Sequence, residues 1–303
     1  MKKIGVLLVV IAAIMWATCG VFIKVLTKAG FTENEITFAK VGISVVLVFI
    51  FIKVIREKIE KIHSIKDVGL LFLSGSIGYL MYGLTYAKAV HYIPISAAVV
   101  LVYTAPIIVM ICSVFLFHEK LTIKKVLCLI FVVCGCFLVQ EMKSGDFSAK
   151  GIVFGIISGI CYATYTLTNK FLLKKYSVYS VSFYNFLFAF ALIFILTDKS
   201  QIVFKILHSN TKTLIYLILF SMFCGGLSHT LYVKSLEYLE ASKASIITII
   251  EPFTASLLGI ILFHEANSMT KIVGLAMILF SLILLNINTE QLYKQKQSFY
   301  KMK

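Results

Sequence analysis

Charged residues are scarce in this chain of 303 residues: they make up only 14%, and just 14 residues are Asp or Glu. A soluble domain carries about 25% charged and 45–50% apolar residues, whereas this sequence is 60% hydrophobic. The apolar residues gather in blocks of roughly 20, the length that an α-helix needs to cross a bilayer. The composition excludes a water-soluble protein and predicts an all-α integral membrane protein.

Several functional motifs are missing as well. The sequence has no glycine-rich nucleotide-binding loop, so ATP is not expected to drive the protein directly. The seven cysteines lie inside apolar blocks without the spacing of metal ligands. They are predicted to be small buried hydrophobes, and no metal or other cofactor is expected. The net charge of +15 lies in loops between apolar blocks, where it favours anionic lipid headgroups and not nucleic acid.

Two copies of one unit make up the chain. A shift of 146 residues, without a gap, superimposes Gly5 on Gly151, Lys24 on Lys170, Tyr86 on Tyr232, Pro106 on Pro252, and His118-Glu119 on His264-Glu265. We divide the sequence into a first repeat at 1–140, a second repeat at 151–288 and a basic tail at 289–303. Duplicated membrane units are typical of secondary transporters.

Hydropathy predicts ten transmembrane helices, at 4–26, 36–55, 68–88, 95–116, 123–140, 151–172, 178–197, 213–234, 243–263 and 270–288. Each repeat holds five spans, an odd number, so the second repeat must insert upside down relative to the first. With the N-terminus in the cytoplasm, 19 of the 29 Lys and Arg residues are cytoplasmic and 8 are outside. This bias predicts that both termini lie in the cytoplasm, and we expect the protein in a bacterial cell membrane.

Short motifs recur in matching order in the two repeats: Trp16-Ala17-Thr18, Tyr86-Ala87-Lys88-Ala89, Pro106 to Glu119, Gly135, Tyr232 to Ser235, Glu251-Pro252, Glu265 and Gly274. Their order and double occurrence resemble the EamA family of the drug/metabolite transporter superfamily. The resemblance implies a basket of ten helices around a central cavity. It also implies alternating access and the export of small metabolites such as amino acids.

Glu251 is the one carboxylate near the middle of a predicted span. Inserting a charge there costs on the order of 3 kcal/mol, so such a residue normally faces a cavity and serves function. His229 lies inside the eighth span and is able to carry a proton. Both are candidates for lining the cavity and for proton coupling. The alternative for each is a neutral side chain that only hydrogen-bonds a neighbouring helix.

Aromatic residues form a second group of candidates for the cavity wall. Tyr79, Tyr82 and Tyr86 have the spacing of one helix face. Four more aromatic residues lie at comparable depth: Trp16, Tyr103, Tyr162 and Tyr165. A cavity lined in this way would stack on an aromatic or cationic organic solute. The alternative is ordinary core packing.

Two lysines and two prolines stand out within the spans. Lys24 and Lys40, near outer span ends, either extend to the interface or bind a substrate carboxylate. Pro106 and Pro252 each remove a backbone donor from the middle of a predicted helix. We predict that they break these helices and contribute to gating.

Packing motifs account for further residues. Gly151, Gly155 and Gly159 form a double GxxxG motif, which predicts close helix packing. The sequence leaves open whether this packing is within the chain or across a dimer, and so leaves the oligomeric state open. Glu119 and Glu265 each follow a histidine and are expected to tie helix ends together. They lack the second histidine of a zinc-protease helix.

Three classes of function compete. We predict a secondary active transporter that exports amino acids or related amphipathic and aromatic solutes by alternating access, with proton coupling through Glu251 or His229 as a further hypothesis. An intramembrane enzyme is an alternative, but one mid-membrane carboxylate and one histidine are too few for its chemistry, so the sequence predicts no enzyme. A passive facilitator or lipid-handling protein with the same helical frame is the other alternative.

Overall fold

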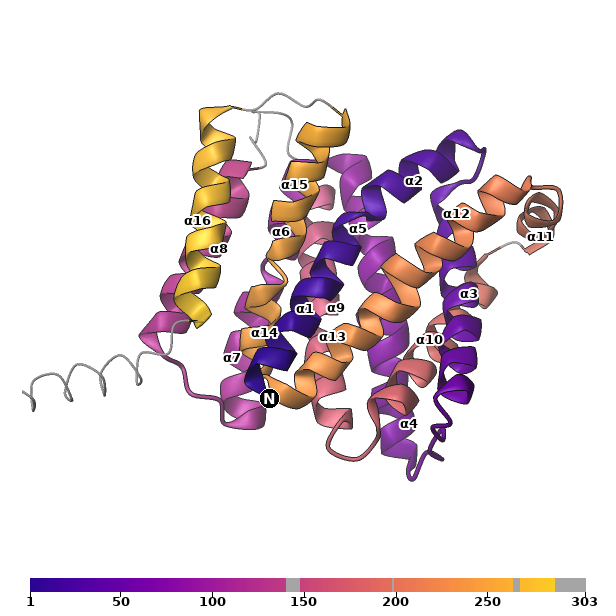
Figure 1. Cartoon of the computed structure of the whole chain (residues 1–303), viewed down its shortest axis with the longest axis horizontal. Coiled ribbons are helices and arrows are strands. Elements are labelled where there is room, and N and C mark those ends of the chain that lie inside the picture. Colours follow the sequence, from indigo (N-terminus) through magenta and orange to yellow (C-terminus); the bar gives the residue numbers. More distant parts are fainter. Residues whose placement is uncertain (140–147, 198, 264–267, 287–303) are drawn as a thin grey trace, which may run out of the picture.

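The computed structural model describes residues 1–139, 148–197, 199–263 and 268–286, and within these ranges every regular element is a helix (Figure 1). The first half comprises α1 (Lys2–Ala17), α2 (Cys19–Lys28), α3 (Glu33–Val54), α4 (Ile65–Phe72), the π-helix η1 (Leu73–Met81), α5 (Tyr82–Tyr92), α6 (Ile95–Val102), α7 (Ala105–Phe117) and α8 (Ile123–Val139). The second half comprises α9 (Ala149–Leu172), α10 (Val178–Leu196), α11 (Lys199–Leu207), α12 (Thr211–Ser221), the π-helix η2 (Met222–Gly226), α13 (Leu227–Tyr238), α14 (Ala241–Ile247), α15 (Ile250–Phe263) and α16 (Met269–Asn286). Residues 140–147 at the junction of the repeats, Glu265 and the tail at 289–303 lie outside the described residues.

Eight helical stretches are long and apolar enough to cross a membrane: Lys2–Lys28, Glu33–Val54, Ile65–Tyr92, Ala97–Phe117, Ala149–Leu172, Val178–Leu196, Thr211–Tyr238 and Ala241–Ile261. The prediction of an all-helical membrane protein is therefore confirmed for the described residues. The remaining two predicted spans correspond to α8 and α16, which have 17 and 18 residues. Helices of this length reach about 26 Å, short of the ~30 Å hydrocarbon core, so the count of ten crossings stays a prediction.

An approximate twofold relation between the halves is visible where α8 packs against α16. Cys128 Sγ donates to the Ser281 carbonyl at 3.4 Å, and Ser281 Oγ donates to the Cys128 carbonyl at 2.9 Å. Seven residues further along α8, Gly135 meets Gly274, where an added Cβ would lie 2.7 Å from the Gly135 carbonyl oxygen. The 146-residue shift maps each contact onto the other. Reciprocal contacts of this kind are the mark of a twofold interface, and they make the two helices antiparallel.

The glycine stripe of α9 packs within the chain. Its three glycines lie against the first half: Gly151 against Ile93, Gly155 against Leu101 and Gly159 against Thr104. A Cβ at any of these glycines would approach its neighbour to 2.4–2.6 Å, so only glycine permits the contact. The glycine stripe therefore packs against the other half of the same chain, and the oligomeric state stays open.

Several helices that hydropathy predicts as continuous are interrupted. The π-helical turns η1 and η2 fall at matching places in the two halves, and such turns are frequent at functional sites. Further breaks separate α6 from α7 and α14 from α15. Pro106 and Pro252 follow these breaks, at the second position of α7 and the third of α15. First-turn N–H groups need no partner within the helix, so each proline lies where a new helix begins. The role of the prolines in gating stays a prediction.

A buried carboxylate ties the halves together on the face that carries the N-terminus. Asp67 of α4 accepts hydrogen bonds from Lys175 Nζ at 2.9 Å and from Tyr176 Oη at 2.8 Å. Both partners belong to the turn between α9 and α10. The hydrogen bond to Asp67 raises the pKa of Lys175.

Glu119 makes a second tie on the same face. It follows α7, and its carboxylate accepts hydrogen bonds from the backbone N–H groups of Ala241 and Ser242 at 2.7 and 3.3 Å, and from the Ser242 hydroxyl. It therefore caps the N-terminus of α14, where the helix dipole favours a carboxylate. On the opposite face, Lys205 of α11 pairs with Glu35 of α3 at 2.8 Å. The sequence did not predict α11.

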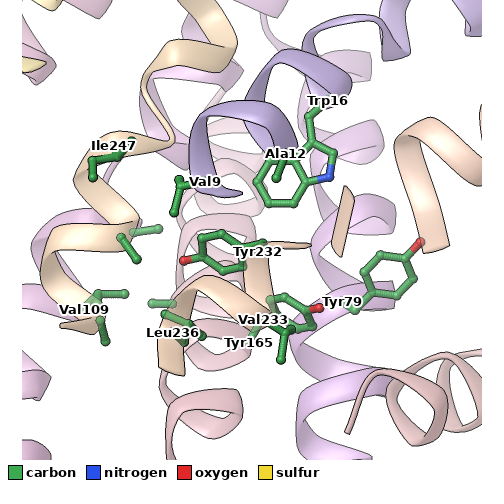
Figure 2. Packing of buried hydrophobic residues seen from close by; sticks show 14 of the residues in the cluster. Val9, Ala12, Trp16, Tyr79, Val109, Tyr165, Tyr232, Val233, Leu236 and Ile247 are labelled. Atoms are coloured by element: carbon green, nitrogen blue, oxygen red, sulfur yellow. The ribbon is translucent and has the colours of Figure 1, made fainter. Parts of the chain in front are cut away.

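Figure 2 shows the core where the halves meet, with Val9, Ala12 and Trp16 of α1 beside Tyr165 of α9 and Tyr232 of α13. Tyr232 is fully buried, and its hydroxyl lies 2.8 Å from Thr166 Oγ1. Aromatic side chains thus fill the centre of the helical basket, next to the interrupted helices.

Candidate functional site

A cavity of about 100 Å³ lies between the two halves. Its wall is formed by α1, α2, α3, η1 and α5 of the first half and by α9, η2, α13 and α15 of the second. All of these elements except α3 and α9 form or adjoin a helix interruption. The breaks in the helices therefore open the space around which the site is built.

Five of the predicted aromatic residues line this cavity: Trp16, Tyr79, Tyr82, Tyr162 and Tyr165. Trp16 and Tyr162 hold equivalent places in the two halves and meet edge to face, with ring centroids 6.4 Å apart. The centroids of Tyr82 and Tyr162 are 5.6 Å apart, and those of Tyr79 and Tyr165 are 6.2 Å apart. Together the rings form a continuous wall suited to an apolar or cationic group.

The Tyr79 hydroxyl is available to a ligand. The side chain is only 5% exposed and lines the cavity. Its Oη has no hydrogen-bond partner among the described residues. A buried hydroxyl without a partner costs about 1–3 kcal/mol, so a polar group on a bound solute would offset that cost.

Glu251 reaches the cavity from the first turn of α15. The break after α14 sets its backbone N–H 2.9 Å from the Thr248 carbonyl. Its carboxylate therefore lies near the positive end of the α15 dipole, which favours a negative charge. Within the described ranges, no Lys, Arg or His forms an ion pair with it.

Lys40 brings the opposite charge to the same cavity from α3. Its Nζ lies 5.4 Å from the ring centroid of Tyr79 and 5.7 Å from that of Phe220, which is cation–π geometry. Like Glu251, it has no ion-pair partner in the part of the chain that the structure describes. Buried charges are normally paired, so the cavity presents two opposite charges to whatever enters it.

His229 connects the halves at the cavity wall. It is the third residue of α13, directly after η2. The Trp16 indole Nε1 donates to its Nδ1 at 3.2 Å, and the ring centroids are 4.8 Å apart. The structure thus brings both candidates for proton coupling, His229 and Glu251, to one cavity.

Three predicted residues lie outside the cavity. Tyr86 is one turn beyond Tyr82 on α5 and packs against a separate cluster that includes Ala89. Tyr103 is buried in the core at the break between α6 and α7. Lys24 is exposed on α2, because the break at Thr18 separates this helix from α1.

Sequence reasoning missed part of the wall, including Cys19, Thr37, Gly78, Gly83 and Cys224. The two cysteines come from different halves, so no local spacing connects them. Gly78 had a usable signal as a glycine inside an apolar span. An added Cβ there would lie 2.7 Å from the Tyr165 Cα, so glycine is what allows η1 to approach α9.

The chemistry available in this cavity is recognition and proton binding. Among the described residues, no three His, Cys, Asp or Glu side chains gather as metal ligands. Glu251 offers a proton site, Lys40 a positive charge and the rings an apolar surface.

Comparisons with known proteins identify a family and relatives with this architecture. A model of the EamA-like transporter family matches residues 3–140 and again 149–287. An uncharacterized transporter of Archaeoglobus fulgidus is 25% identical over 280 residues, which cover 91% of this chain and 94% of that protein. The uncharacterized inner membrane transporter YicL of Salmonella typhimurium is 23% identical over 292 residues, covering 95% and 96%. A solved crystal structure with 14% identity shares the fold, with a TM-score of 0.76 over 94% of this chain and 97% of that one.

Proposed function

Because this chain belongs to the EamA-like transporter family, we propose that it is a secondary active transporter that carries a small zwitterionic solute through the cavity between its halves. Its relatives in bacteria and archaea are named transporters. The chain is accordingly an integral membrane transporter and not an enzyme. We further propose its substrate, its direction of transport and its coupling ion.

One observation carries the choice of substrate: Lys40 and Glu251 face one aromatic cavity, and neither has an ion-pair partner among the described residues. A solute carboxylate would pair with Lys40, and a solute amine would pair with Glu251. The Tyr79 hydroxyl would then bond a polar atom of the solute. Amino acids with apolar or aromatic side chains combine all three features.

The transport cycle that we propose is alternating access by an inverted repeat. The reciprocal contact of α8 with α16 supports two halves of opposite orientation, each of five crossings. Polar ties on the two faces, at Asp67 and Glu119 on one and Glu35 on the other, would open in turn. Export is the direction that we assign, with the inward proton gradient as its energy source and Glu251 as the proton site.

Transport into proteoliposomes tests this function directly. We expect uptake of apolar or aromatic amino acids, and accumulation above the external concentration only when a pH gradient is imposed. Analogues that lack the carboxylate or the amine should compete poorly. Equal, non-accumulating flux with and without the gradient would indicate a passive facilitator. Transfer of lipid analogues without amino-acid transport would indicate a lipid-handling protein.

The membrane orientation is tested separately. The bias of Lys and Arg predicts that Lys61 is cytoplasmic and Lys212 is outside. Both side chains are exposed. On a cysteine-free background, an impermeant thiol reagent should label Lys212→Cys in intact cells and spare Lys61→Cys. The reverse labelling would overturn the orientation but not the fold.

A further inference from the structure

The strongest unexplained feature of the cavity wall is a single nitrogen with competing partners. His229 Nδ1 lies 3.2 Å from Trp16 Nε1, 3.0 Å from the Gly225 carbonyl oxygen and 3.4 Å from Ser228 Oγ. An indole N–H only donates a hydrogen bond, and a carbonyl oxygen only accepts one. The imidazole nitrogen therefore accepts a hydrogen bond from Trp16 when it carries no proton. When it carries one, it donates to the Gly225 carbonyl.

The position of the Gly225 carbonyl is fixed by the other half of the chain. Ser44 of α3 donates to the Ser221 carbonyl at 3.0 Å and accepts from the Gly226 N–H at 3.1 Å, which holds both ends of η2. A Cβ on Gly225 would lie 2.2 Å from Ser44 Oγ, so the position requires glycine. The acceptor that competes with Trp16 is thus held in place.

We propose that His229 is a positioning residue that joins the two halves at the cavity only while its Nδ1 carries no proton. In that state Trp16 of α1 donates to it, which ties the first half to α13 of the second. When Nδ1 takes up a proton, His229 donates to the Gly225 carbonyl and the bond to Trp16 is lost. Protonation of one side chain therefore releases a contact between the halves.

Neighbouring groups set the pH at which this occurs. Lys40 opposes a positive charge on His229, and an ionised Glu251 favours it. The other titratable groups that line the cavity are Cys19 of α2, Tyr79 of η1, Tyr82 of α5, Tyr162 and Tyr165 of α9, and Cys224 of η2. A substrate carboxylate that pairs with Lys40 would weaken the repulsion between Lys40 and a positively charged His229, and so would promote protonation of His229. The role in a cycle rests on the proposed function, whereas the exchange of hydrogen bonds does not.

The chain offers a direct probe of this exchange, because Trp16 is its only tryptophan. Intrinsic tryptophan fluorescence of the full-length protein in liposomes therefore reports on the surroundings of Trp16 alone. On acidification from about pH 8 downward, to below the usual histidine range, we expect a single transition. The emission should weaken, as protonated imidazole quenches indole, and should shift to shorter wavelength as Nε1 loses its acceptor.

Three variants make the experiment decisive. His229→Asn keeps an acceptor near Nδ1 without a titrating group, and should abolish the transition. His91→Asn, beside Tyr92 and away from the cavity, should leave it unchanged. Glu251→Gln should shift the midpoint without removing it.

The absence of a transition in the unmodified protein, its survival in His229→Asn, or its loss in Glu251→Gln would each overturn the proposal. Histidine 15N NMR of the unmodified protein gives an independent test. Above the transition, His229 should be the tautomer protonated at Nε2, and the Nδ1 tautomer would overturn the proposal. Neither measurement needs a substrate, so failure here is distinguishable from failure of the transport assay.

Discussion

Where the second half of the chain carries His229, the first half carries Gly83 at the equivalent place in the repeat. Two further pairs differ in the same way, with charge in only one half: Glu251 against Ala105, and Lys40 against Phe186. All three polar residues line the cavity. The halves therefore share a helical plan but contribute different chemistry to the space between them.

One pair of positions that is identical in the two halves makes packing contacts and does not line the cavity. Gly5 lies against Leu239 and Gly151 against Ile93, which are equivalent contacts made by equivalent residues. In both, a Cβ would approach the neighbouring side chain to 2.7 Å or less. Identity between the repeats thus accompanies packing in this pair, whereas the three polar positions that differ line the cavity. The following predictions test that division.

The largest effect is expected at Glu251. Glu251→Gln keeps the size and hydrogen-bonding capacity of the side chain but removes its charge and its proton. We expect complete loss of pH-gradient-driven accumulation in proteoliposomes, while substrate binding or exchange survives in part. Glu237→Gln, which alters a half-exposed pair with Lys234, is the control and should accumulate normally. Accumulation by Glu251→Gln with unchanged pH dependence would make Glu251 structural.

A packing position should fail through folding and not through transport. In Gly274→Leu the new Cβ would lie 2.7 Å from both the Gly135 carbonyl oxygen and the Val139 nitrogen. Overpacking costs roughly 1–3 kcal/mol, and backbone atoms yield less than side chains. We expect a lower yield of folded protein and a lower melting temperature in detergent. Gly69→Leu, with nothing within 4 Å of its Cβ, should melt as the parent does, and equal melting of the two variants would contradict the contact.

Lys40 should affect affinity more than stability. Lys40→Gln removes the positive charge that we assign to the substrate carboxylate. Hydrogen bonds to charged groups contribute about 1.5–3 kcal/mol, so the apparent affinity for an amino acid should fall tenfold or more. Affinity for the corresponding amine should change little. Lys24→Gln, which lies on the exposed face of α2, is the matched control, and an equal loss in both variants would remove Lys40 from the site.

The smallest effect is expected at Lys175, outside the membrane spans. Its pKa is raised by the hydrogen bond to Asp67, so the stability that it contributes is fully present below the unfolded-state value of about 10.4. That contribution is lost as the pH rises through the folded-state value. The side chain is 49% exposed, so screening keeps the effect small. Lys175→Gln should lower the melting temperature slightly at pH 7, and this difference from the parent should vanish above about pH 11. Lys61→Gln should show no change at either pH, and a difference that persists at high pH would contradict the ion pair.

Hydropathy and the 146-residue repeat were sufficient to predict the eight long apolar stretches, because the length of an apolar block directly reflects the thickness of the bilayer. They could not predict the interruptions. The turn η2 depends on Ser44, a residue 177 positions before Ser221, whose carbonyl it binds. No local pattern contains that contact.

The candidate site was predictable to the same extent. Trp16, Tyr79, His229 and Glu251 were found because polar and aromatic groups at mid-depth are costly or unusual. Cys19 and Cys224 could not be paired from sequence, because they come together only when the two halves fold against each other. The sequence named Lys24 and Lys40 together, and only the structure separates them, because Lys40 lines the cavity and Lys24 is exposed on α2.

The contact between α8 and α16, called the seam below, also has a consequence for biosynthesis. Its two helices are the last helices of their halves that the structure describes, so α8 emerges from the ribosome more than 100 residues before its partner. Until α16 inserts, the Gly135 face of α8 has only lipid beside it, and the hydrogen bonds of Cys128 with Ser281 cannot form. The seam therefore closes after synthesis of α16, and a chain that stops before residue 268 would insert its earlier helices yet leave the bundle open along one side.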